Sequence, residues 1–361
     1  MTRLIATYRV PSDAGAIEAR ARAIAVEQSV EMPLDAIEDA AILNEIVGRV
    51  EGIEDQGGGR FAVRIGLAVA TIGADAGQLL NMLFGNTSLQ EDAALIDVEM
   101  SAEFAAGFGG PRHGIGGLRA RTGAAGRALT CSAIKPQGLP PDRLAALVEQ
   151  FARGGLDFVK DDHGLADQAY SPFAERVAAC AAAARRATTA TGHLTRYVPS
   201  LSGDLERMRR QIGLARDEGV DTVMIAPALA GFATAQVLIR DNPDVTFLAH
   251  PTMGGAARLA PELLIGKLFP LIGADAVIFP TYGGRFGYSR ATCRTLAGNA
   301  RAASALPVPA GGMTLERIGE KLDFYGPETM LLIGGSLLMA RERLTEETTA
   351  FTRAVAAHRY G

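Results

Sequence analysis

A lysine, two aspartates and a histidine end a short apolar segment in the middle of the sequence. Residues 154–164 read GGLDFVKDDHG. On a strand, Lys160 and Asp162 point to one face, and His163 follows where the strand gives way to a loop. This cluster suits a hard divalent cation, and the histidine extends the choice toward Mn²⁺, Zn²⁺ or Fe²⁺. Lys160 could be a ligand only if neutral or converted to a carbamate; the alternative is a Lys–Asp ion pair without metal.

Three further features could take part in chemistry. Lys135 ends an earlier apolar run. If desolvated there, it could act as an acid or base; the alternative is a lysine at the rim that extends its ammonium group to water. His250 could move protons or be a histidine of the core. Glycine pairs at 311–312 and 334–335 are typical of tight turns, or of a phosphate cradle made by backbone N–H groups.

The elements that must position these residues begin at residue 128, where short apolar runs alternate with helical segments. The eight runs are 128–135, 156–162, 193–200, 222–228, 246–252, 276–282, 306–312 and 330–336. Runs that are apolar at nearly every position are typical of strands covered on both faces. Eight strand–helix units favour a closed (β/α)₈ TIM barrel, in which the candidate residues all fall at the carboxyl ends of strands.

The first third of the chain has a different pattern. It predicts strands at 4–10 and 61–69, helices at 17–27 and 77–85, and loops at 55–59 and 106–117. We therefore expect a smaller α+β domain over residues 1–121 and the barrel over residues 122–361.

Composition excludes several classes of protein. The net charge of the 361 residues is -4, which gives no electrostatic footprint for nucleic acid or an anionic membrane. No apolar run reaches the length of about 18 residues that a membrane span needs. The N-terminus lacks the pattern of a signal peptide and the three cysteines are far apart, so we expect a cytoplasmic protein. Serine-hydrolase, Walker A and zincin motifs are absent from the sequence.

Residues 154–162 resemble the Gly-Gly-Leu-Asp-Phe-x-Lys-Asp-Asp-Glu signature of the RuBisCO large-chain superfamily. Three other stretches agree with that superfamily in order: FGGPRHGI at 108–115, AIKP at 133–136 and the Gly231-Phe232 pair. The agreement extends from about residue 27 to residue 335 and implies the fold already expected, an α+β N-terminal domain followed by the barrel.

The resemblance also implies roles for individual residues. Lys160 corresponds to the lysine that CO₂ carbamylates, and Asp162 to a ligand of Mg²⁺, with His163 as the third candidate ligand. Lys135 corresponds to the lysine that moves protons at the substrate carbon, and His250 to the catalytic histidine of the fifth strand. Glu27 and Asn86 correspond to residues that one subunit of a homodimer contributes to its neighbour's active site. Gly312, Gly334 and Gly335 correspond to the backbone that binds one phosphate, and Gly311 joins this phosphate site by its position at the end of the seventh strand.

Several positions depart from the CO₂-fixing pattern. They are His163 in place of the last carboxylate of the signature, Gln137 in place of a second lysine, Arg285 in place of the mobile-loop lysine, Pro251 in place of an arginine, Ile278 in the run that replaces a histidine, and Ala310 in place of a serine. Residues that would bind the second phosphate of a bisphosphate are therefore missing, which argues against a carboxylase. The chain is similar to the RuBisCO-like proteins (form IV), in their non-photosynthetic branch.

The resemblance implies a metal-bound enediolate formed from a sugar monophosphate. We expect decarboxylation or C–C hydrolysis of a β-keto acid phosphate such as 3-oxo-isoapionate 4-phosphate, because a histidine at 163 lowers the anionic charge around the metal and strengthens its pull on an enolate. One alternative is an isomerase or enolase of a methylthio-sugar phosphate in methionine salvage. Another is a catalytically silent dimeric barrel.

Overall fold

The computed structural model describes residues 2–360, which divide into two compact units. Of these residues, the first unit contains 2–109 together with 253–264, and the second contains 110–252 together with 265–360. The sequence-based boundary at residue 121 places residues 110–121 in the N-terminal domain, whereas here they belong to the second unit. Within residues 2–360, no helix combines the length and apolar character needed to cross a membrane.

The first unit is built on a four-stranded antiparallel sheet in the order β2-β3-β1-β4. Its strands are β1 (Arg3–Pro11), β2 (Arg49–Asp55), β3 (Arg60–Ala68) and β4 (Ala94–Glu99). Its helices are α1 (Ile17–Glu27), η1 (Leu34–Ala36), η2 (Ile42–Ile46), η3 (Val69–Thr71), α2 (Ala76–Phe84), η4 (Asn86–Leu89), α3 (Ala102–Ala106) and α10 (Pro261–Leu263). Alternation along β1 buries Leu4, Ala6, Tyr8 and Val10, as a sheet covered on one face requires.

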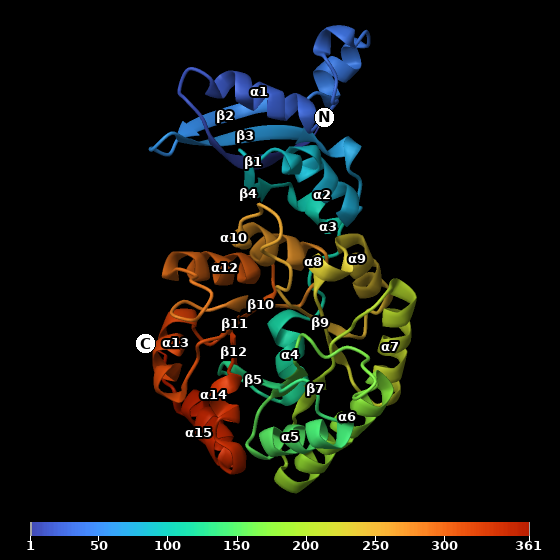
Figure 1. The fold of residues 1–361 in the computed structure, drawn as a ribbon, viewed down its shortest axis with the longest axis vertical. Coiled ribbons are helices and arrows are strands. Elements are labelled where there is room, and N and C mark those ends of the chain that lie inside the picture. The colour runs from blue at the N-terminus through green and yellow to red at the C-terminus, as the bar shows by residue number, and fades with distance from the viewer. Residues whose placement is uncertain (1, 361) are drawn as a thin grey trace. The chain divides into compact units, whose positions relative to one another are not determined.

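The second unit is a parallel eight-stranded barrel, as the sequence predicts (Figure 1). Its strands are β5 (Leu129–Ile134), β6 (Phe158–Asp161), β7 (Arg196–Val198), β8 (Thr222–Ile225), β9 (Thr246–Ala249), β10 (Ala276–Pro280), β11 (Leu306–Ala310) and β12 (Met330–Leu332). The order β7-β6-β5-β12-β11-β10-β9-β8 leaves β7 and β8 to close the ring. They meet where Leu201 N–H donates to Met224 O at 2.8 Å and Met224 N–H donates to Pro199 O at 2.9 Å.

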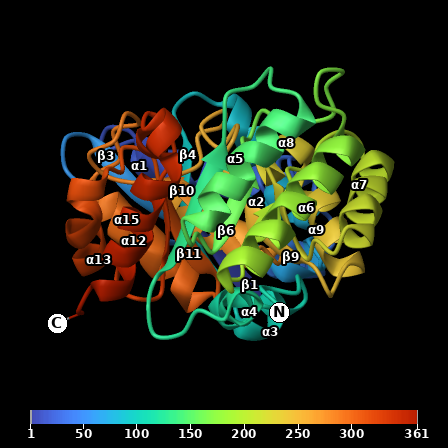
Figure 2. The ribbon, with the colours of Figure 1, turned by 90° about the horizontal axis from the view of Figure 1, so that it is seen from below.

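Helices flank the barrel strands on the outside (Figure 2). They are α5 (Pro141–Arg153), α6 (Phe173–Thr191), α7 (Leu205–Asp217), α8 (Pro227–Ala230), α9 (Phe232–Asp241), η5 (Leu264–Leu268), α11 (Phe269–Leu271), α12 (Arg290–Ala302), η6 (Leu315–Arg317), α13 (Ile318–Tyr325), α14 (Gly335–Leu338), η7 (Arg341–Arg343) and α15 (Leu344–Ala357). The barrel core is apolar and includes Leu129, Phe158, Leu248 and Leu306, none of which is exposed.

Helix α4 (Gly114–Thr122) closes the N-terminal end of the barrel, since Leu118 packs into the core beside the first residues of the strands. Asp275, just before β10, accepts hydrogen bonds from the N–H groups of His113 (2.6 Å) and Gly114 (3.0 Å) and so holds the start of the helix. Gly114 has φ of +51°, and a Cβ there would lie 2.4 Å from Ser304 O. The loop predicted at 106–117 therefore ends at residue 113, where α4 begins. The sequence did not predict this helix because it has no apolar stripe.

Candidate active site

Four predicted site residues meet at the carboxyl ends of β5, β6 and β9. Asp162 Oδ1 lies 2.7 Å from Lys135 Nζ and 3.3 Å from His163 Nδ1. The rings of His163 and His250 stack with 4.9 Å between centroids and 5° between planes. Barrel topology accounts for this meeting, because the three strands end at one mouth although their residues are far apart in the chain.

The carboxylate of Asp162 is held in its ionised form. Burial by itself raises the pKa of this group, but hydrogen bonds from His163 and Lys135 outweigh the burial and hold the pKa well below its usual range. Asp162 is thus available as an anion at physiological pH, either to a cation or to the ammonium of Lys135.

Lys160 is buried, with 3% of its surface exposed. Its Nζ donates to Asp161 O at 2.8 Å. Burial lowers the pKa of the amine, and the charge of Lys135 acts in the same direction. A lowered pKa increases the share of neutral amine, which is the form that reacts with CO₂ or binds a metal.

Asp161 points away from this cluster into a buried ion pair. Arg176 of α6 lies 3.2 Å from Asp161 Oδ2, and both side chains have no exposed surface. The hydroxyl of Tyr197 donates to Asp161 Oδ1, and Ser200 N–H donates to Oδ2 at 3.0 Å. Asp161 therefore fixes the backbone between Lys160 and Asp162. This role of Asp161 could not be predicted from the sequence.

His250 is held as a neutral imidazole. Thr252 N–H donates to His250 Nδ1 at 3.2 Å, and the Thr252 hydroxyl oxygen lies 2.6 Å from the same nitrogen. With Nδ1 as the acceptor, the ring proton of the neutral imidazole would be on Nε2. Burial, followed by the charges of Lys160 and His163, lowers the pKa of His250 to about 2. Thr252 was missed by sequence reasoning, although its place two residues after a strand-end histidine is a usable signal.

This lowered pKa predicts an acid-sensitive stability. Below pH 6.5 the unfolded chain protonates His250 while the folded protein does not, so stability falls as pH falls toward about 2. We expect a slope from this group of up to about 1.4 kcal/mol per pH unit in the metal-free protein. Denaturant unfolding between pH 6.5 and about pH 5 should show a smaller slope for His250→Gln. Equal slopes for the two proteins would contradict a neutral His250 in the folded protein.

The predicted metal ligands supply few donors without modification. Within residues 2–360, no three His, Cys, Asp or Glu side chains are grouped so that they could hold a metal ion. Asp162 and His163 supply two donors, and a carbamate on Lys160 would add the oxygen donors that hard cations prefer. The donor set therefore fits a divalent cation better in that modified form.

Two glycine turns follow β11 and β12. Gly311 and Gly312 have φ of +75° and +67°. Only glycine adopts this left-handed backbone conformation readily. The hydroxyl of Ser336, beside Gly334 and Gly335, donates to Met313 O at 3.0 Å and so ties the two turns together. Backbone turns of this kind can present N–H groups to an anion.

Three other predicted site residues have partners of their own. Arg285 is exposed on the loop after β10, with its guanidinium 4.8 Å from the ring centroid of Phe286. In the first unit, Asn86 Nδ2 donates to Glu27 Oε1 at 3.0 Å. Gln28, which sequence reasoning did not select, supports this pair by accepting from Thr87 N–H at 2.9 Å.

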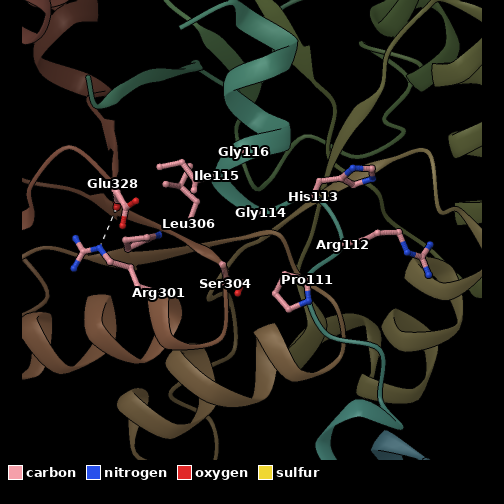
Figure 3. Close-up of a pocket in the computed structure, with 12 residues that line it drawn as sticks. Pro111, Arg112, His113, Gly114, Ile115, Gly116, Arg301, Ser304, Leu306 and Glu328 are labelled. Atoms are coloured by element: carbon pink, nitrogen blue, oxygen red, sulfur yellow. Dashed lines mark hydrogen bonds between the residues drawn. The ribbon is translucent and has the colours of Figure 1, made fainter. Parts of the chain in front are cut away.

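A pocket of about 320 Å³ lies at the opposite, N-terminal end of the barrel (Figure 3). It is lined by the first turn of α4 and by the segment between α12 and β11. Arg301, which borders it, donates from Nε to Glu328 O at 3.2 Å. None of the strand-end residues described above lines this pocket, so we do not place the active site there.

Comparison with known proteins gives the family. The model of the ribulose bisphosphate carboxylase large chain, catalytic domain, matches residues 114–262. A 5-methylthioribulose-1-phosphate isomerase from Rhodospirillum rubrum is 58% identical over 360 residues, which cover 98% of this chain and 96% of that protein. A 2,3-diketo-5-methylthiopentyl-1-phosphate enolase from Geobacillus thermodenitrificans is 32% identical over 93% of this chain and 88% of its own length.

A solved structure gives the same result. The crystal structure of a Rubisco-like protein from Rhodopseudomonas palustris superposes with a TM-score of 0.93 at 51% identity, covering 99% of both chains. The chain belongs to the RuBisCO large-chain family and, within it, to the RuBisCO-like proteins. This confirms the family and the fold that the sequence predicts.

Proposed function

We propose that the protein is an isomerase of a methylthio-sugar phosphate, the first alternative of the sequence analysis. The observation that carries this proposal is the 58% identity, over 98% of the chain, with the 5-methylthioribulose-1-phosphate isomerase. The enolase relative also acts, by its name, on a phosphate ester that carries a methylthio group. Both relatives support this alternative better than cleavage of a β-keto acid phosphate.

The chemistry requires moving a proton between neighbouring carbon atoms. Shifting a carbonyl group along a sugar needs a group that removes a proton beside the carbonyl and returns one to the adjacent carbon. Lys135 is our candidate for this group, with Asp162, 2.7 Å from its Nζ, holding it in place. His250, neutral with its proton on Nε2, can donate a hydrogen bond to an oxygen that gains negative charge.

We assign Lys160, Asp162 and His163 to a divalent cation, preferably Mg²⁺, with Mn²⁺ or another divalent metal as alternatives. The cation would supply positive charge to the oxygens of the enediolate. The burial of Lys160 supports a carbamate there, because burial favours the neutral amine, which is the form that attacks CO₂. We assign the phosphate to the turns that contain Gly311, Gly312, Gly334 and Gly335.

Product analysis tests this proposal against the other two candidates. The protein, with Mg²⁺ and bicarbonate, would be incubated separately with 5-methylthioribulose 1-phosphate and with 3-oxo-isoapionate 4-phosphate, and followed by ³¹P and ¹³C NMR. We expect an isomeric ketose phosphate from the first compound and no reaction of the second. Carbon loss from the second compound with no reaction of the first would favour the β-keto acid cleavage that His163 suggested. No reaction of either, with no change of melting temperature on adding any divalent ion, would favour a silent barrel.

We also propose a homodimer in which Glu27 and Asn86 of one subunit serve the active site of the other. Glu27→Ala and Asn86→Ala should each lower kcat/KM by about tenfold to a hundredfold while sedimentation still shows a dimer. Glu18→Ala is the matched control, because Glu18 is an exposed carboxylate of the same helix, α1. An unchanged rate in both site variants would argue against a shared site.

A further inference from the structure

The two turns that follow β10 and β11 lie against each other through their backbones. A Cβ on Gly312 would lie 2.6 Å from the Cα of Gly284, and a Cβ on Gly284 would lie 3.0 Å from Gly311 O. No side chain separates the segments at these points. A displacement of either turn must therefore move the other turn or open a gap between them.

Arg317 spans both turns. Its Nη1 donates to Gly283 O at 3.3 Å and to Gly312 O at 3.4 Å. Glu320, three residues further along the chain, holds the guanidinium, with 3.1 Å between Arg317 Nε and Glu320 Oε2. The arginine is thus oriented by a carboxylate on one side and by two carbonyl groups on the other.

Holding these carbonyl groups also sets the direction of two N–H groups. In a planar trans peptide, the C=O and the following N–H point in opposite directions. Arg317 therefore fixes the N–H groups of Gly284 and Met313 to point away from itself. Met313 O in turn accepts from the hydroxyl of Ser336, which extends the connection to the turn after β12.

A second cation from the same helical segment holds the turn after β10. Lys321 of α13 is fully buried, and its Nζ donates to Tyr282 O at 2.9 Å. The same Nζ lies 3.1 Å from the centroid of the Tyr282 ring. Lys321 therefore holds the carbonyl group of Tyr282, and Arg317 holds that of Gly283. Both contacts lie within three residues of Arg285.

We propose that Arg317 is a positioning residue that couples the two turns, so that a phosphate group bound at Gly311 and Gly312 also fixes the segment that carries Arg285 and Phe286. This inference rests on the phosphate assignment of the proposed function. Arg317 would thereby let the exposed loop that carries Arg285 respond to the phosphate of the substrate.

Hydrogen exchange with inorganic phosphate as the probe tests the coupling directly. In the wild-type protein, saturating phosphate should slow exchange in both 283–288 and 311–314. In Arg317→Gln, phosphate should slow exchange only in 311–314 and should bind about tenfold more weakly by calorimetry. Arg294→Gln is the matched control. Arg294 belongs to the neighbouring helix α12, its guanidinium lies 5.2 Å from the centroid of the Phe324 ring, and among residues 2–360 we find no hydrogen bond from it to either turn. It should behave like the wild type.

The outcomes separate this inference from the proposed function. If phosphate slows exchange in both segments of Arg317→Gln as it does in the wild type, or in neither segment of the wild type, the coupling is wrong. If the wild type shows the coupling but does not turn over the methylthio-sugar phosphate, the isomerase proposal fails and the coupling stands. Should Arg317→Gln not fold, Arg317→Lys decides, because lysine keeps the positive charge but lacks the guanidinium that bonds Glu320 and the two carbonyl groups at once. It should then show the same loss of coupling.

Discussion

Lys160→Met is expected to lose turnover by at least about a thousandfold while the protein stays folded. The lysine is the predicted metal ligand that needs a carbamate, and methionine cannot form one. Methionine is similar in length and apolar, so it should fill the buried site without leaving the cavity that Lys160→Ala would create. Because burial already disfavours the charged amine, the melting temperature should be unchanged or higher.

The carbamate can be measured separately from activity. Wild-type protein supplied with ¹³C-bicarbonate and Mg²⁺ should show a carbamate signal by ¹³C NMR, and Lys160→Met should lack it. Lys160→Ala should also lose turnover, although it tests stability less cleanly. A methionine variant that keeps its turnover would remove Lys160 from the metal site.

Arg176→Met is expected to destabilise the fold by about 3–5 kcal/mol. The change leaves Asp161 as a buried carboxylate without its cation, since both side chains lie fully inside the protein. It also removes donors to Ser171 O at 2.8 Å and Ala166 O at 2.6 Å, in the segment between β6 and α6. Urea unfolding at neutral pH would measure the loss.

Arg185→Met on the same helix is the matched control. Arg185 is more than half exposed, and its ion pair with Glu218 is on the surface, where such pairs contribute little. We expect a change within about 0.5 kcal/mol. A similar loss of unfolding free energy in the two variants would show that the buried Asp161–Arg176 pair is not the cause of the destabilisation.

The barrel could be predicted from the sequence because its strands are short, apolar on nearly every residue and regularly spaced. Each of the eight predicted runs contains one of the strands β5 to β12. In the first unit, β2 and β4 were missed. Strand β2 is largely exposed and carries Glu51, Gly52 and Glu54, so neither alternation nor composition identifies it.

The candidate site could be predicted in part. Lys160, Asp162 and His163 were visible because charged residues interrupt an apolar run, and the barrel topology explains why Lys135 and His250 join them. The supporting residues could not be found in this way. Arg176 and Tyr197 reach Asp161 from other elements, and Arg317 reaches two carbonyl groups that have no side-chain signature in the sequence.

The most direct test of the central claim follows the carbon-bound hydrogens of 5-methylthioribulose 1-phosphate by ¹H NMR in D₂O with the wild-type protein, Mg²⁺ and bicarbonate. We expect deuterium to replace hydrogen at the carbon atoms beside the carbonyl group, while an isomeric ketose phosphate appears with all its carbon atoms. Lys135→Met should abolish both changes. Full retention of hydrogen at these carbons during turnover, or deuterium uptake that persists in Lys135→Met, would contradict it.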